Sequence, residues 1–287
     1  MPEVVRLRAG ELSVELVPAV GGAVRSFRWR ETPVFREGPA EMTDANTGGS
    51  YPLVPFSNRV RDGRFTFRGR EVELSPNLPP QKHPLHGQGW RGAWRVEAAE
   101  ERRAVLVYDH AAGEWPWAYQ ATQAFELDEA GLTIALSCRN GGPDTMPCGL
   151  GFHPYYPADA ETVLDTSVAE VWTIDEEVMP VGRAPATGRY DLRERRIDGA
   201  DLDNGYGGWS GRTELRQRDH RLVISSAEAR FFQVYAPPEG GIVVAEPVTH
   251  ANAALNEPEE HWAELGLQVL EPGETAAMSA RFEVMPR

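Results

Sequence analysis

Short stretches in which apolar and polar residues alternate dominate this chain. Leu12, Val14 and Leu16 form one such stretch, and Met278–Val284 forms another. Because successive side chains of a strand point to opposite faces, this period of two predicts strands with one buried face. Apolar or β-branched runs of strand length predict further strands at Ala104–Tyr108, Leu132–Cys138, Leu222–Ser226, Phe231–Ala236, Ile242–Ala245 and Gly266–Leu270.

The gaps between these stretches are rich in glycine and proline, which is typical of turns. No apolar period of 3.6 residues is sustained over a helix length, and one short helix is expected within residues 252–265, where Pro258 interrupts it. Many short strands separated by turns predict an all-β sandwich or barrel, and without a low-complexity linker we expect residues 1–287 to form a single domain. Residues 37–50 and 183–212 are predicted to be long loops, which often carry function.

Charge and composition narrow the classes of partner. The 287 residues include 29 Lys plus Arg and 43 Asp plus Glu, which gives a net charge of −14. Such a negative field repels phosphate backbones and anionic lipid, so we expect no nucleic-acid or membrane partner. No basic segment followed by an apolar stretch opens the chain, and no apolar run has the length that spans a bilayer. The expected compartment is the cytoplasm, and the two cysteines do not form a disulfide framework or a metal motif.

His83 and His86 form the first candidate cluster, followed by Trp90 and Trp94. Two histidines beside glycine indicate either acid–base chemistry or metal ligation. A cupin-like metal site would combine both with His153 and Glu246, but the H-x-H spacing of such a site and the H-E-x-x-H motif are absent. The other interpretation of this cluster is a solvated turn.

The second cluster is Gly149–Tyr156, which contains His153 before a proline and two tyrosines after it. The proline biases His153 toward an extended backbone, which sets the direction of its side chain. The ring of Tyr155 has a flat face for the C–H surface of a pyranose and a hydroxyl that can hydrogen-bond to it. A packed aromatic turn is the alternative.

The third cluster is Ile242–Pro247, where four apolar residues are followed by Glu246. A carboxylate at the end of a buried strand is costly to desolvate, and burial raises its pKa, which makes Glu246 a candidate general base. The alternative is a carboxylate at the rim that reaches water. The glycine-rich stretch Asn204–Gly211 lacks the lysine of a phosphate-binding loop and is predicted to be a flexible loop. The histidines without a partner pattern are predicted to be surface or core residues: His110, His220, His250 and His261.

Taken together, these segments resemble the aldose 1-epimerase (galactose mutarotase) family, in the family's order over nearly the whole chain. The matching residues are Asn58-Arg59 with Gly63 and Phe65, Leu85-His86-Gly87 with Trp90, Trp115-Pro116-Trp117, Gly131-Leu132, Met146-Pro147, Gly149–Tyr156, Gln233-Val234-Tyr235 and Glu246-Pro247 with Asn256. The resemblance implies a galactose-mutarotase-like supersandwich of antiparallel strands that interconverts the α and β anomers of a small-molecule sugar without a cofactor or metal.

The resemblance also implies roles for individual residues. His153 resembles the acid that protonates the ring oxygen, and Glu246 the base that takes the proton of the C1 hydroxyl. His86 and Arg59 resemble groups that orient and polarise the sugar. Further substrate contacts are expected from Asn58, Asp203, Tyr155 and Gln233.

Two departures from the family pattern bear on the substrate. The segment Phe152–Tyr156 and the dipeptide Glu246-Pro247 resemble a divergent branch near the hexose-6-phosphate mutarotases. A phosphorylated sugar would require an anion patch, for which Arg59, Arg61 and Arg91 are the candidates. The second hypothesis for function is a carbohydrate-binding or sugar-sensing protein that keeps the fold without the chemistry, and no oligomeric state is predicted.

Overall fold

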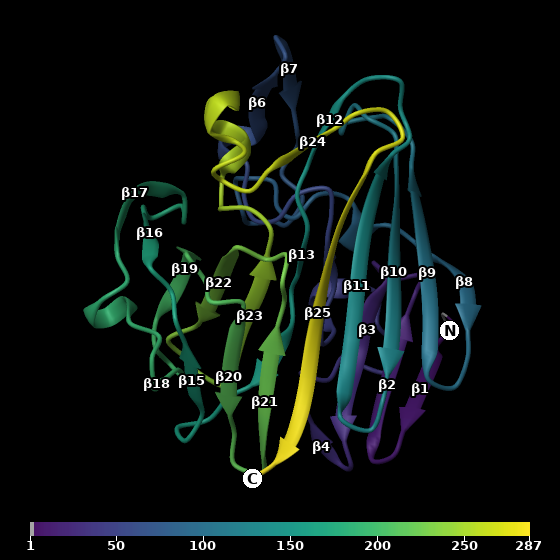
Figure 1. The fold of residues 1–287 in the computed structure, drawn as a ribbon, viewed down its shortest axis with the longest axis vertical. Helices are drawn as coiled ribbons and strands as arrows, with labels where there is room; N and C mark the ends of the chain where they lie inside the picture. The colour runs from purple at the N-terminus through teal and green to yellow at the C-terminus, as the bar shows by residue number, and fades with distance from the viewer. Residues whose placement is uncertain (1–2) are drawn as a thin grey trace.

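Two large antiparallel sheets make up most of the computed structural model, which describes residues 3–287 (Figure 1). The larger has nine strands, in spatial order β18 (Arg195–Arg196), β15 (Val163–Thr166), β20 (Arg212–Arg216), β21 (His220–Ser225), β25 (Thr275–Pro286), β11 (Gly131–Asn140), β10 (Tyr119–Leu127), β9 (Arg103–His110) and β8 (Arg95–Ala99). The other sheet has eight strands. Seven of them follow the order β17 (Pro180–Pro185), β16 (Glu170–Ile174), β19 (Leu202–Gly207), β22 (Phe231–Ala236), β23 (Ile242–Val248), β13 (Gly151–Phe152) and β5 (Pro52–Leu53), and the eighth, β14 (Tyr155–Pro157), also pairs with β23.

Smaller elements complete the structure. A four-stranded sheet contains β1 (Val5–Ala9), β2 (Leu12–Val17), β3 (Ala23–Trp29) and β4 (Thr32–Pro33). A hairpin joins β6 (Arg64–Phe67) to β7 (Arg70–Glu73), and a further two-stranded sheet pairs β12 (Met146–Cys148) with β24 (Gln268–Leu270). The helices are single 3₁₀ turns: η1 (Ala45–Thr47), η2 (Arg61–Gly63), η3 (Gly89–Arg91), η4 (Gly188–Tyr190), η5 (Ala254–Asn256) and η6 (Glu259–His261). The predicted all-β antiparallel architecture is confirmed.

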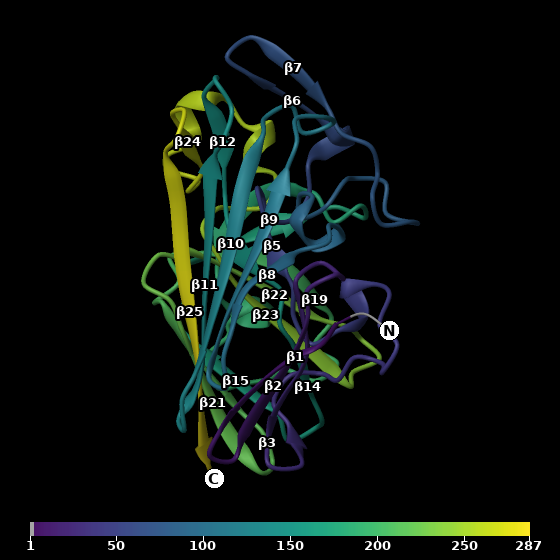
Figure 2. The same cartoon turned by 90° about the vertical axis from the view of Figure 1, so that its right-hand side faces the viewer.

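The alternation seen in the sequence places the core between the sheets. Along β25 every second side chain from Ala276 to Val284 is buried, as the period of two predicts. Phe282 is fully buried in this row, and its ring packs edge-on against that of Phe35, 5.1 Å away between centroids. Figure 2 shows the long strands β9, β10, β11 and β25 running together along one side of the molecule.

The prediction of a long loop over residues 183–212 is wrong. Leu202–Gly207 forms β19, which lies inside the eight-stranded sheet between β16 and β22. The glycine-rich stretch Asn204–Gly211, predicted to be a flexible loop, therefore begins within a strand. Its glycines serve close packing: a Cβ on Gly207 would lie 2.8 Å from the indole of Trp172, and one on Gly205 would lie 3.2 Å from the Gln233 side chain. Residues 37–50, by contrast, contain only the turn η1.

The short helix expected within residues 252–265 is replaced by the two 3₁₀ turns η5 and η6, on either side of Pro258. Proline has no backbone N–H and cannot continue a helical hydrogen-bond ladder, which explains the interruption. Among residues 3–287, the structure contains no helix with the length and apolar character needed to cross a membrane.

The buried Phe282 provides a test of this packing. Phe282→Ala removes a fully enclosed ring next to Phe35, and we expect the free energy of unfolding to fall by about 3–5 kcal/mol. Val269→Ala, at an exposed position, should change it by less than about 0.5 kcal/mol. Urea unfolding followed by circular dichroism measures both, and equal effects of the two substitutions would contradict the assigned core.

Candidate active site

Strand register brings His153 and Glu246 together. Both β13 and β14 pair with β23, through Gly151 with Val248 and through Tyr155 with Val244. His153 lies between these two pairings and therefore beside Glu246, with its Nε2 3.5 Å from the Glu246 Oε1. The prediction that Glu246 ends its strand is wrong, because β23 continues to Val248, and the carboxyl group is buried rather than at the rim.

Gln233 and Asp203 extend this row across the sheet. Gln233 is paired with Glu246 on β23 and with Gly205 on β19, and Asp203 lies two residues before Gly205, on the same face of β19. The Gln233 Nε2 donates a hydrogen bond of 2.8 Å to the Asp203 Oδ1. Gly205 has no side chain here, which leaves room for the amide of Gln233, since a Cβ would lie 3.2 Å from it.

Arg59 and His86 lie beside these residues, and each comes from an irregular segment outside the sheet. The Arg59 guanidinium lies 3.6 Å from the Asp203 carboxylate and donates a 3.2 Å hydrogen bond to the Asn58 Oδ1. The His86 ring meets the His153 ring edge-on, with 5.2 Å between the ring centroids. The structure therefore brings together the predicted residues Asn58, Arg59, His86, His153, Asp203, Gln233 and Glu246.

The hydrogen bonds of His86 determine its tautomer. Its Nδ1 accepts a 3.0 Å hydrogen bond from the Asn58 backbone N–H, so the proton of the neutral ring is on Nε2. Burial, with the positive charge of nearby groups, holds the His86 pKa well below its usual value. His86 is thus a neutral hydrogen-bond donor through Nε2, which fits an orienting role better than that of a base.

Burial shifts the pKa values of His153 and Glu246 in opposite directions. It lowers the pKa of His153 to about 3, since the ring has no water around its charged form. It raises the pKa of Glu246 well above the ordinary value, an effect that Asp203 increases and Arg59 opposes. Both shifts favour the uncharged forms, so the neutral pair, in which the carboxyl group holds the proton, comes close in free energy to the ion pair or below it.

Three buried polar atoms of this site have no partner among residues 3–287: the Arg59 Nε, the His153 Nδ1 and one carboxylate oxygen of Glu246. Buried polar groups are almost always hydrogen-bonded, because leaving one unpaired costs about 1–3 kcal/mol. A cationic donor, an imidazole nitrogen and a carboxylate oxygen are groups that a ligand with several hydroxyl groups can satisfy.

The sequence does not predict the aromatic side chain that packs against His153. The Tyr51 ring stacks on the His153 ring, with 4.5 Å between centroids and an interplanar angle of 16°. The Tyr155 hydroxyl donates to the Asn46 Oδ1, and the Arg36 guanidinium lies 3.6 Å from the centre of the Tyr155 ring. Tyr155 therefore lies at the site as predicted, mostly buried, and its stacking on a sugar stays a prediction. No motif marks Tyr51, whose role comes only from its contact with a residue a hundred positions away.

The cupin-like metal set does not assemble. The Nδ1 of His83 accepts from the Asp62 backbone N–H at 2.9 Å, and its Nε2 lies 3.1 Å from the Glu177 carboxylate, so both nitrogens are engaged by other groups. Within residues 3–287, no three or more His, Cys, Asp or Glu side chains converge as a metal site requires. His250 is a core histidine: it accepts from the Ser57 N–H through Nε2 and contacts the Ala251 carbonyl through Nδ1.

Comparisons with known proteins bear on the family and the fold of this chain. The chain is 33% identical over 297 residues to the uncharacterized protein YphB of Escherichia coli K12, covering 96% of this chain and 98% of that protein. A crystal structure from Escherichia coli K12, assigned provisionally as an aldose 1-epimerase, superposes with a TM-score of 0.90 at 28% identity, over 99% of each chain. A galactose mutarotase-like protein from Clostridium acetobutylicum superposes with a TM-score of 0.85 at 17% identity, over 98% of this chain and 95% of the other.

These likenesses confirm the predicted galactose-mutarotase-like fold. The sequence pattern of the family described as aldose 1-epimerase matches residues 3–283, which include every residue of the site. This chain therefore belongs to the aldose 1-epimerase family.

Proposed function

We propose that this protein is a mutarotase that interconverts the α and β anomers of a free aldose by general acid–base catalysis. The buried pair of His153 and Glu246, 3.5 Å apart with opposite pKa shifts, is the observation that carries the proposal. Anomer exchange needs only that one oxygen gains a proton while its neighbour loses one, so the chemistry itself requires no cofactor. A cytoplasmic location remains a prediction.

The proposed reaction starts from the ion-paired form of the two residues. The Glu246 carboxylate takes the proton of the C1 hydroxyl while the His153 imidazolium gives a proton to the ring oxygen. The bond between C1 and the ring oxygen breaks, and the open-chain aldehyde remains beside a neutral carboxyl group and a neutral imidazole. Rotation about the C1–C2 bond and reversal of both transfers close the ring as the other anomer.

The pKa shifts support this order of charge states during the reaction. The two transfers together convert a buried ion pair into a buried neutral pair, and burial favours the neutral pair. Ring opening therefore returns the enzyme groups to the state that their surroundings stabilise and recovers the cost of forming the ion pair. The Nε2–H of His86 is placed to donate to a sugar oxygen throughout, because its other nitrogen is held by the Asn58 N–H.

The surrounding charges favour a neutral aldose over a sugar phosphate. Arg59 faces Asp203, Arg61 lies 3.8 Å from Asp175, and Lys82 lies 3.0 Å from Glu177. Each of these cations is thus next to a carboxylate, and Glu246 adds a further acidic group at the centre. Arg91, the third candidate for an anion patch, is exposed on the turn η3.

Substitution of the pair tests catalysis directly. Glu246→Gln and His153→Gln each remove one proton-transfer group while keeping a polar side chain, and we expect kcat/KM to fall by roughly 10²–10⁴-fold. Polarimetry of freshly dissolved α-aldoses, compared with buffer alone, measures the rate, and Val269→Ala serves as the control. Sugar binding by the wild type without any acceleration of mutarotation would instead indicate the carbohydrate-binding alternative.

The pH dependence of kcat/KM provides a second test. The active pair holds one proton: a second enters only near the His153 pKa of about 3, and the last leaves only above the raised pKa of Glu246. We expect kcat/KM to stay level or rise as the pH falls from about 7 to about 5, and to fall on the alkaline side. Asp203→Asn should move the alkaline limb to lower pH, since it removes a charge that raises the Glu246 pKa. If kcat/KM instead fell on acidification with a midpoint at about pH 6.5, the ordinary pKa of histidine, the assignment of His153 and Glu246 as this pair would be contradicted.

A further inference from the structure

The segment that carries Arg59 belongs to no strand ladder; side chains hold it, together with backbone hydrogen bonds to residues 84–86 around an isolated antiparallel bridge between Arg59 and Leu85. Residues 57–62 lie outside the sheets, and two of them, Asn58 and Asp62, have positive φ angles of 58° and 53°. Five of the backbone N–H groups donate to side-chain acceptors: Ser57 to His250 (2.9 Å), Asn58 to His86 (3.0 Å), Arg59 to Asn252 (3.1 Å), Arg61 to Asn256 (2.7 Å) and Asp62 to His83 (2.9 Å). The position of Arg59 therefore depends on residues far away in the sequence.

Asn252 is the acceptor for Arg59 itself. Its Oδ1 binds the Arg59 N–H, and its Nδ2 donates to the Val178 carbonyl at 3.4 Å. The side chain is 8% exposed, so water does not compete strongly for either bond. Asn252 thus joins the Arg59 backbone to residues 175–179, the tip of the β16–β17 hairpin.

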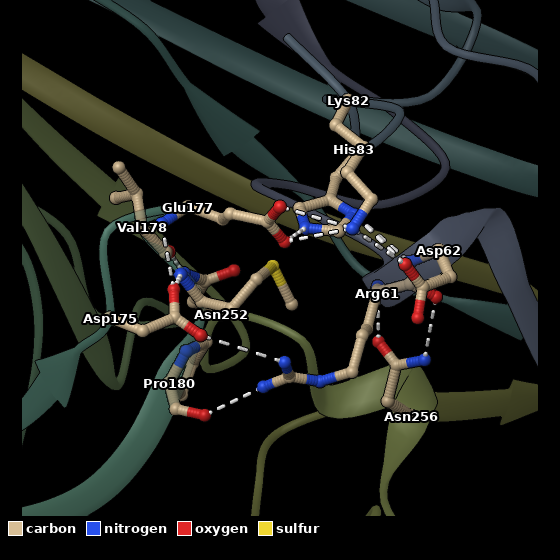
Figure 3. Close-up of polar contacts among 11 residues, drawn as sticks. Arg61, Asp62, Lys82, His83, Asp175, Glu177, Val178, Pro180, Asn252 and Asn256 are labelled. Carbon is tan, nitrogen blue, oxygen red and sulfur yellow. Dashed lines mark hydrogen bonds and ion pairs between the residues drawn. The ribbon is translucent and has the colours of Figure 1, made fainter.

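The hairpin tip is fastened to the same segment by a second set of contacts, shown in Figure 3. The Arg61 guanidinium donates to the Pro180 carbonyl at 2.8 Å and lies 3.8 Å from Asp175. Glu177 accepts from Lys82 at 3.0 Å and faces His83. Within the tip, the Asp175 carboxylate accepts from the Glu177 and Met179 N–H groups, which holds Val178 at its positive φ of 61° with its carbonyl toward Asn252.

We infer that Asn252 is a positioning residue for Arg59, and that the hairpin tip holds Asn252 in the orientation that this role requires. The inference rests on the proposed function, in which Arg59 binds sugar hydroxyls. The Arg59 guanidinium is itself buried, with a nitrogen that no residue from 3 to 287 engages, so this nitrogen is free to donate to a ligand. A small shift of its backbone displaces this nitrogen, and a misplacement of about 1 Å at a binding site costs up to about 100-fold in rate.

Two near-isosteric substitutions separate this role from a merely structural one. Asn252→Leu keeps the size of the side chain and removes both polar atoms, whereas Asn252→Asp retains an oxygen that accepts from the Arg59 N–H. Asn140→Leu is the matched control, because Asn140 is also a buried asparagine and is bonded to backbone groups of a different region, Gly142, Asp144 and Leu270. All three variants are compared with wild type in steady-state mutarotation assays and in hydrogen–deuterium exchange of the peptide that covers residues 57–62.

We expect Asn252→Leu to raise KM by about 10-fold with a smaller change in kcat, and to speed exchange of the Arg59 N–H. Asn252→Asp should stay within about threefold of the wild-type KM, and Asn140→Leu should change neither KM nor exchange in this segment. In an Arg59→Ala background, Asn252→Leu should raise KM no further, because the group that it positions is gone.

Equal KM changes in the presence and absence of the Arg59 side chain would overturn the inference, as would unchanged exchange of the Arg59 N–H in Asn252→Leu. If the wild type accelerates the mutarotation of no aldose, the proposed function fails. The exchange measurement then still decides whether Asn252 holds the Arg59 backbone.

Discussion

The structure depends above all on the burial of two ionisable side chains against one sheet. His153 and Glu246 are cross-strand neighbours because β13 and β14 both pair with β23 around them. Enclosure by Tyr51 and the surrounding sheet penalises both charged forms, which lowers the histidine pKa and raises that of the carboxyl group. An acid and a base of ordinary, separate pKa values thereby become a buried pair whose uncharged forms are favoured, and the proposed anomer exchange uses this pair.

Rigid strands supply one half of the site, and an irregular segment supplies the other. Glu246, Gln233 and Asp203 are held by register, which a sheet specifies through its ladder of hydrogen bonds. Arg59 has no such ladder, and its segment relies on acceptors from three histidines and two asparagines. Three of these acceptors are imidazole nitrogens, which can accept only while they carry no proton. The geometry of this half is therefore tied to neutral histidines.

Charge compensation around the site is consistent with a ligand that is polar and uncharged. Arg59, Arg61 and Lys82 each lie next to a carboxylate, from Asp203 at the centre to Asp175 and Glu177 on the hairpin tip. Because the outer pairs are largely exposed, each contributes little alone, and their joint effect is to hold the tip against the Arg59 segment. The ion pairs that neutralise these charges therefore also fix the position of the hairpin tip.

The sequence by itself determined the all-β class, most strand positions and the main candidate residues, because alternation reports which face of a strand is buried and the family motifs are local. It misplaced β19, since glycines that permit close packing look the same in a sequence as glycines in a flexible loop. Only the tertiary structure decided that Glu246 is buried within its strand, that Tyr51 stacks on His153, and that Asn252 holds Arg59. These contacts join residues about 100 to 200 positions apart, and no local pattern encodes a contact that depends on how whole sheets pack.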